Sequence, residues 1–322
     1  MRILILGAGG MIGQKLAARI ARDGFRGAPA EVIAHDMAFP PSPAPVARQI
    51  TGTVTDAGIM KPLAAERPDV VFHLASIVSG EAEVDFDKGW QVNMFPCWEL
   101  LQALRAEHEA SGGSYRPRIV FTSSIAVFGA PFPEVFDDEF LTAPLTSYGA
   151  QKVICEQMIN DFSRKGFVDG VSVRLPTICV RPGKPNKAAS GFFSGIIREP
   201  LNGQEAILPV PDTVSHMHAS PRSAVGFLLK AAELDTADLG ARRALNMPGV
   251  ACTVAEQIEA LRDVAGNNVV ALIKRQPDPL IERIVEGWPR RYTADRATAL
   301  GFKAETDFHE IVRTYIDEDL NR

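Results

Sequence analysis

Short apolar runs alternate with segments of helical periodicity in the first half of the chain. Residues 2–6 (Arg-Ile-Leu-Ile-Leu) are almost continuously apolar, as is typical of a strand buried on both faces. Similar runs follow at 31–36, 68–75, 118–122 and 171–175, and helical patterns separate them, for example at 90–107 and 148–163. This alternation predicts an α/β fold with a doubly wound parallel sheet between layers of helices.

The rhythm changes after residue 176. Residues 177–215 are rich in Pro, Gly, Asn and Lys, so we expect a loop-rich segment there. A helical pattern returns at 221–234, and the chain from residue 253 onward is mostly helical in pattern. We therefore predict a larger domain and a smaller, mostly helical substrate domain, with these boundaries: 1–176 joined by 216–250, and 177–215 joined by 251–322.

The composition excludes several classes of protein. The 322 residues contain 34 Lys+Arg against 39 Asp+Glu, a formal net charge of -5, and 46% are hydrophobic. A disordered chain would have fewer apolar residues, and a nucleic-acid-binding protein would carry a basic stripe. No apolar stretch reaches the roughly 20 residues that span a bilayer. We therefore expect a soluble cytoplasmic protein without nucleic-acid or membrane partners.

The cysteines and histidines do not predict a metal site. Four cysteines lie far apart without a Cys-x-x-Cys pair, so we interpret them as reduced thiols. His216 and His218 have no acidic residue at metal-ligand spacing, and we expect them to be structural rather than catalytic.

A glycine-rich turn follows the first strand. Gly7, Gly10 and Gly13 form a G-x-x-G-x-x-G motif, with Met11 and Ile12 opening the next helix. Glycine lets a backbone turn sharply and approach a pyrophosphate, and the helix N-terminus supplies N–H groups for that anion. The position of the motif between a strand and a helix predicts a Rossmann-type dinucleotide site.

Asp36 ends the second predicted strand, 23 residues after Gly13. A carboxylate at that place accepts hydrogen bonds from the adenosine ribose hydroxyls and repels the additional phosphate of NADP. The position therefore favours NAD as the cofactor.

A Tyr-x-x-x-Lys motif indicates the chemistry. Residues four apart share a helix face, so the ammonium of Lys152 lies near the phenol of Tyr148 and favours the phenolate. Such a tyrosine serves as a general base for an alcohol. Ser124 follows the strand at 118–122, and we expect its hydroxyl to bond the reacting oxygen.

These motifs occur in a specific order with two others, His73-Leu74-Ala75-Ser76 and Ser123-Ser124 before Val127-Phe128-Gly129. The set resembles the extended short-chain dehydrogenase/reductase family, also called the NAD-dependent epimerase/dehydratase family. The resemblance implies that Ser124 orients the substrate oxygen, Tyr148 is the acid/base and Lys152 also binds the nicotinamide ribose. It implies further cofactor contacts at the following residues: Thr53, Val54, Leu74, Ala75, Ser76, Asn93 and Pro176. Members of the family often form homodimers, which we also expect here.

The segment after residue 174 bears on the substrate. Nucleotide-sugar enzymes of the family commonly have an asparagine where this chain has Thr177, and they continue with Tyr-Gly-Pro, which is missing here. Residues 174–193 resemble instead the branch that oxidises the C2 hydroxyl of a four-carbon sugar acid such as D-erythronate. A substrate carboxylate needs cations, and Arg181, Lys184 and Lys187 are the local ones. The expected substrate contacts are these: Ser76, Ser124, Tyr148, Thr177, Arg181 and Asn186.

Three alternatives remain open from the sequence. The chain could be a nucleotide-sugar epimerase or oxidoreductase, an enzyme like L-threonine dehydrogenase, or a non-catalytic NAD sensor on the same fold. Retention of Ser124, Tyr148 and Lys152 argues against the sensor, because a sensor has no need of the complete set.

Overall fold

A computed structural model describes residues 1–183 and 189–320. Its chain divides into two compact units, each formed by separate stretches of sequence. The first unit comprises 1–127, 146–174 and 225–245, and the second comprises 128–145, 175–224 and 246–322.

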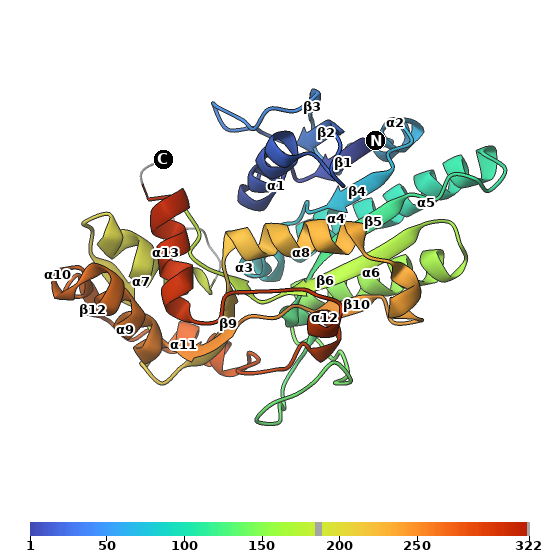
Figure 1. Ribbon diagram of the computed structural model, residues 1–322. Coiled ribbons are helices and arrows are strands. Elements are labelled where there is room, and N and C mark those ends of the chain that lie inside the picture. The colour runs from blue at the N-terminus through green and yellow to red at the C-terminus, as the bar shows by residue number, and fades with distance from the viewer. Residues whose placement is uncertain (184–188, 321–322) are drawn as a thin grey trace. The chain divides into compact units, whose positions relative to one another are not determined.

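The first unit is built on a seven-stranded sheet in the order β10-β6-β5-β4-β1-β2-β3 (Figure 1). Pairing is parallel from β5 through β4, β1 and β2 to β3, for example with Ile3 opposite both Val32 and Val70. The α/β prediction is therefore confirmed. The strands are β1 (Arg2–Leu6), β2 (Glu31–Asp36), β3 (Arg48–Thr51), β4 (Val70–His73), β5 (Arg118–Ser124), β6 (Asp169–Leu175) and β10 (Ala244–Asn246).

Helices of this unit pack apolar faces on the sheet. Leu100, Leu101 and Leu104 of α5 share a buried cluster with Leu4 and Phe121 of the strands. The helices are α1 (Met11–Asp23), α2 (Met60–Ala65), α3 (Ser79–Val84), α4 (Phe86–Asn93), α5 (Phe95–Ala110), α6 (Ser147–Arg164) and α8 (Pro221–Glu233), with 3-10 turns η1 (Ile125–Val127) and η2 (Thr236–Leu239).

The helix predicted at 90–107 is two helices, α4 and α5. Pro96 lies in the first turn of α5, where its missing N–H costs no helical hydrogen bond. Proline also disfavours helical backbone at the preceding residue, so a single helix through this position is unfavourable. The periodicity of the apolar residues continues across the break and conceals it.

The second unit contains a three-stranded sheet in the order β11-β9-β7 and a two-stranded pair of β8 and β12. The segment predicted as loop-rich contains the 11-residue helix α7, which was missed because two glycines and Pro200 interrupt its pattern. Phe193, Ile196 and Ile197 of α7 are fully buried in the core of the unit. The elements are β7 (Thr177–Ile178), α7 (Gly191–Leu201), β8 (Ala206–Leu208), β9 (Ser215–Ala219), β11 (Val250–Thr253), α9 (Val254–Ala265), α10 (Asn267–Val270), β12 (Ile273–Arg275), α11 (Pro279–Glu286), α12 (Asp295–Ala299) and α13 (Phe308–Glu318).

Four stretches lie with the second unit although the sequence had grouped them with the first, namely 128–145, 175–176, 216–224 and 246–250. In the segment 128–145, the ring of Phe136 packs on that of Tyr292 at 5.5 Å. Strand β9 pairs with β7 and β11, which fixes it in the second unit. What each unit binds stays a prediction. Among the described residues, no helix is long and apolar enough to span a membrane.

Candidate active site

The glycines of the first loop serve two different purposes. Gly7 has a φ of +85°, and a Cβ there would lie 2.6 Å from the Ala75 nitrogen. A Cβ on Gly13 would lie 2.3 Å from the Gly7 oxygen. Gly10 is exposed, and the nearest atom to an added Cβ is 3.5 Å away. The fold therefore needs Gly7 and Gly13, whereas Gly10 leaves open space at the end of α1.

Gly9, which the motif analysis left out, connects this loop to Asp36. An added Cβ would lie 1.9 Å from the Ala38 oxygen, and the Gly9 N–H donates to Asp36 Oδ2 at 2.8 Å. The Gly-Gly pair at 9–10 was the feature of the sequence that could have indicated a role for Gly9. The bond places the carboxylate of Asp36 beside the glycine loop.

The N-terminus of α1 fits the pyrophosphate of a dinucleotide. Its N-cap, Gly10, provides no side-chain hydrogen bond, and the first turn has no acidic residue. The partial positive charge there is therefore not neutralised by the local chain. The open side of Gly10, with Met11 and Ile12 next to it, is compatible with NAD bound at this end.

The remaining expected cofactor residues differ in what they expose. Leu74, Ala75 and Ser76 are half-buried, whereas the Val54 side chain is 5% exposed and packed in the core. Thr53 Oγ1 lies 2.9 Å from Thr55 Oγ1 in a local turn. Their contacts with the cofactor stay predictions.

Asn93 is 1% exposed and fastens the loop after β4. Its Oδ1 accepts hydrogen bonds from Ile77 N at 2.8 Å and Ser76 Oγ at 2.9 Å. Its Nδ2 donates to Gln151 Oε1 on α6 at 2.8 Å. Asn93 thus fixes the loop that carries Ser76, and its direct contact with the cofactor stays a prediction.

The structure brings Tyr148 and Lys152 together on α6. Lys152 is 1% exposed, and its Nζ donates to the Thr122 oxygen at 2.8 Å. The same Nζ lies 5.3 Å from the ring centroid of Tyr148. Ser124, at the end of β5, accepts a bond from Ala126 N at 3.1 Å and remains half-buried. The arrangement can hold a proton-accepting phenol beside a fixed cation.

His73 lies next to this group without sharing its chemistry. The side chain is fully buried against the ring of Phe121. Burial, and next the charge of Lys152, lower the pKa of His73 to about 3. The imidazole is therefore neutral at physiological pH and is not a general acid there.

The sequence analysis missed a buried ion pair near the candidate site, formed by Glu156 and Arg174. Glu156 is 2% exposed and binds Arg174 with both carboxylate oxygens, at 2.9 and 2.7 Å. The hydroxyl of Ser123 also donates to Glu156. Glu156 follows Lys152 by four residues, so an acid on the buried face of the predicted helix was the signal. The group connects β5, β6 and α6 through the neighbour of Ser124 in sequence and one helical turn after Lys152.

Two expected substrate residues lie in the second unit. Thr177 is half-buried and its Oγ1 lies 2.9 Å from His216 Nε2. Burial, followed by the nearby Arg198, lowers the pKa of Arg181. Among the described residues, no acceptor lies within hydrogen-bonding distance of the Arg181 guanidinium, which suits an anionic ligand. Asn186 lies outside the described residues, and Pro176 is buried.

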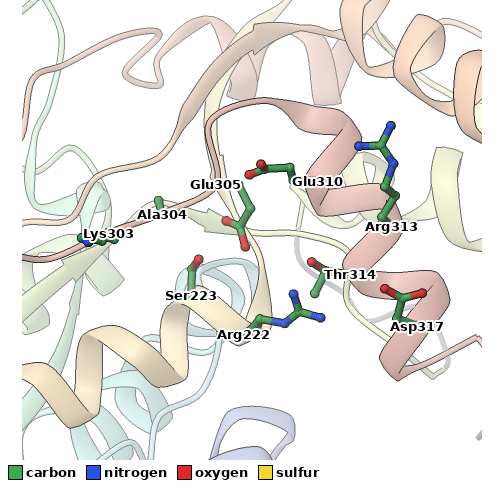
Figure 2. A pocket seen from close by; sticks show the side chains of 9 residues that line it. All are labelled: Arg222, Ser223, Lys303, Ala304, Glu305, Glu310, Arg313, Thr314 and Asp317. Carbon is green, nitrogen blue, oxygen red and sulfur yellow. The ribbon is translucent and has the colours of Figure 1, made fainter.

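A separate hollow of about 440 Å³ lies in the second unit (Figure 2). Two of its acids are bonded within the chain, because Glu305 accepts from Ser220 N and Glu310 from Thr306 N. None of the predicted site residues lines it, so we do not assign it to the reaction. The lining residues are Arg222, Ser223, Lys303, Ala304, Glu305, Glu310, Arg313, Thr314 and Asp317.

Comparison with known proteins identifies the family. The model of the NAD dependent epimerase/dehydratase family matches residues 3–216. The chain belongs to this family. It is 41% identical to a D-erythronate dehydrogenase of Cupriavidus necator over 99% of this chain and 98% of that protein. Identity to a D-erythronate dehydrogenase of Haemophilus influenzae is 37%, over 99% of this chain and 100% of that protein.

A solved structure described as a nucleoside-diphosphate-sugar epimerase from Agrobacterium tumefaciens is also similar. It is 54% identical, covers 99% of this chain and 94% of its own, and superposes with a TM-score of 0.95. The family and the curated relatives together make this member of the family an NAD-dependent dehydrogenase.

Proposed function

We propose that the chain oxidises the C2 hydroxyl of a small sugar acid, with D-erythronate as the best candidate, to the 2-oxo acid. The full-length identity of 41% to a D-erythronate dehydrogenase carries the proposal. The absence of Tyr-Gly-Pro after Thr177 supports it, because that sequence accompanies nucleotide-sugar substrates in the family the chain resembles.

In this reaction Tyr148 removes the proton of the C2 hydroxyl as a general base. Lys152, held by the Thr122 oxygen, stabilises the phenolate and binds the nicotinamide ribose. Ser124 donates a hydrogen bond to the reacting oxygen. NAD, when bound, accepts the hydride from C2. The loop of Gly7, Gly10 and Gly13 with Asp36 holds the cofactor's pyrophosphate and adenosine ribose.

Arg181 binds the substrate carboxylate. The guanidinium is half-buried and lacks an acceptor among the described residues, while its backbone is fixed by Ser194 Oγ at 2.9 Å and by Arg198 at 2.7 Å. A carboxylate in this place would form charge-assisted hydrogen bonds with a positioned cation. Ser76, Thr177 and Asn186 complete the expected set of substrate contacts.

An assay of NADH formation against a panel of compounds tests the proposal. The panel contains four- to six-carbon sugar acids, L-threonine and UDP-sugars, with erythritol as the matched compound that lacks a carboxylate. We expect turnover of D-erythronate and none of erythritol. A complete lack of activity on sugar acids would overturn the proposal.

The similarity to the Agrobacterium protein favours a second candidate, epimerisation or oxidation of a nucleotide sugar. Calorimetry with UDP- and GDP-sugars distinguishes the two. Micromolar binding of a nucleotide sugar, together with no turnover of sugar acids, would favour this second function over the first.

We also propose that the chain forms a homodimer through α4 and α5. Three large aromatic side chains on these neighbouring helices are exposed, namely Phe86 (58%), Phe95 (49%) and Trp98 (43%). Burial of such rings is a common source of association energy. Light scattering should give twice the mass of the chain, and Trp98→Glu should give the monomer mass. A monomeric unaltered protein would contradict the proposal.

A further inference from the structure

His216 and Thr177 are held together by the small sheet of the second unit. Strand β7 runs parallel to β9, with Thr177 opposite His218, and His216 lies two residues earlier on β9. Thr177 Oγ1 lies 2.9 Å from His216 Nε2. His216 is the one partner of this hydroxyl among the residues that the structure describes. Its ring lies parallel to that of Phe193, with 5.5 Å between centroids.

The surroundings of His216 determine which ring nitrogen carries the proton. Nδ1 lies 2.8 Å from the carbonyl oxygen of Pro289, and a carbonyl can only accept a hydrogen bond. Nδ1 is therefore protonated. The ring is 3% exposed, and burial lowers its pKa to about 4, so a second proton is absent at neutral pH. Nε2 accordingly bears a lone pair.

The tautomer of His216 in turn fixes the hydroxyl of Thr177. Because Nε2 can only accept, Thr177 Oγ1 donates its proton to it. The hydroxyl then has only lone pairs left for a ligand. It attracts a substrate hydroxyl and repels an oxygen that has no proton, such as that of a carboxylate. Thr177 is half-buried.

We propose that His216 is a positioning residue that makes Thr177 an obligate acceptor, which selects substrates with a second hydroxyl beside the one that is oxidised. The inference rests on the proposed function and deepens it. It explains how a hydroxylated acid is distinguished from its deoxy analogue, because a deoxy substrate brings no donor and leaves the Thr177 oxygen without its hydrogen bond. The carboxylate is bound elsewhere, by Arg181.

Kinetics with deoxy substrates test the inference on the NAD-loaded enzyme. 2,4-Dihydroxybutanoate lacks the C3 hydroxyl of D-erythronate, and 2,3-dihydroxybutanoate lacks the C4 hydroxyl. For 2,4-dihydroxybutanoate, which lacks the hydroxyl next to C2, we expect kcat/KM to be at least about 100-fold below that of D-erythronate, and 2,3-dihydroxybutanoate, which keeps that hydroxyl, is the control. His216→Phe, which keeps an aromatic ring on Phe193, should reduce this preference about tenfold. The Thr177→Val variant should do the same, and the double variant should not add to it.

The outcomes separate the two hypotheses. Equal losses of kcat/KM on both substrates in His216→Phe, with the preference unchanged, would assign His216 a structural role only and overturn the inference. Inactivity of the unaltered enzyme on every sugar acid would overturn the proposed function and the inference together. Thr177→Ser keeps the hydroxyl and should keep the preference.

Nitrogen NMR of the unaltered protein, labelled at its histidines, gives a test that does not depend on the folding of a variant. We expect a His216 spectrum of the Nδ1–H tautomer at neutral pH. An Nε2–H tautomer or an imidazolium would overturn the inference, since Nε2 would then donate to Thr177.

Discussion

The two units differ in how many charged side chains they bury. In the first unit Lys152, Glu156 and Arg174 are charged and at most 9% exposed. Most buried polar groups are neutral in both units, but in the second unit Arg198, paired with the half-buried Glu199, is the one buried charged side chain among the described residues, and the others are neutral, as with His216, His218 and Gln257. Charged groups in fixed positions suit proton and hydride chemistry, whereas neutral groups can select a substrate by the direction of a hydrogen bond.

The contrast has a physical basis in desolvation. A buried charge is stable only with its partner, so a charged group is rigid once it is assembled. Neutral imidazoles are buried at a smaller cost, provided that their hydrogen bonds are satisfied. The first unit therefore depends more strongly on each partner than the second does.

The strongest test of the chemistry in the first unit is Tyr148→Phe. We expect kcat to fall about 10³-fold, because the general base is lost. Stopped-flow measurement of NADH formation gives kcat. Tyr115→Phe is the matched control, since its hydroxyl donates to the Pro68 oxygen away from the site. A Tyr148→Phe enzyme with unchanged kcat would refute the assignment.

Removal of a buried charge tests the contrast itself. Glu156→Ala deprives Arg174 of its carboxylate and should lower the free energy of unfolding by about 3–5 kcal/mol. Gln257→Leu removes a neutral partner of His218 and should cost about 1 kcal/mol. Urea unfolding measures both, with Glu156→Gln as a milder variant. Equal losses in the free energy of unfolding for Glu156→Ala and Gln257→Leu would contradict this difference between the units.

Substitution of two glycines of the same loop distinguishes an effect on stability from an effect on NAD binding. Gly13→Ala places a Cβ against the Gly7 oxygen and should lower the free energy of unfolding by about 1–3 kcal/mol. Gly10→Ala should cost less than about 1 kcal/mol. It should nevertheless raise the Kd of NAD about tenfold, which is about 1.4 kcal/mol. Thermal unfolding and calorimetry measure the two effects, and tight NAD binding by Gly10→Ala would contradict the placement of the pyrophosphate.

Acid should weaken both units through buried histidines. Burial lowers the pKa of His73 to about 3 and that of His216 to about 4, whereas the unfolded value is about 6.5. Between these values the unfolded chain binds the proton first, so stability is complete above about pH 6.5 and falls as the pH is lowered. From pH 7 to 5.5 each histidine should cost about 1 kcal/mol. Urea unfolding at both pH values should show this loss, and His73→Phe should reduce it. A pH-independent free energy of unfolding would exclude this account.

Short patterns in the sequence predicted many of the candidate site residues of the first unit. The glycine motif, Asp36 and Tyr148 with Lys152 are each defined by spacing along one strand, turn or helix, and β1, β2, β5 and β6 lie where the apolar runs predicted them. Glu156 and Asn93 were not understood from the sequence in this way, because their partners are distant. Asn93 forms a hydrogen bond with Gln151, 58 residues later. Glu156 on α6 forms hydrogen bonds with Arg174 on β6.

The sequence by itself determined the α/β class and the family, and it predicted the site residues whose roles depend on short spacing. Periodicity and glycine geometry act within a few residues, so a linear pattern suffices for them. Only the tertiary structure decided that Gly13 serves the fold while Gly10 stays open, and that segment 128–145 packs with the second unit. It alone also fixed the proton of His216, because that depends on Pro289, 73 residues away along the chain. Hydrogen-bond direction is set by what surrounds a group in space, and no local pattern encodes it.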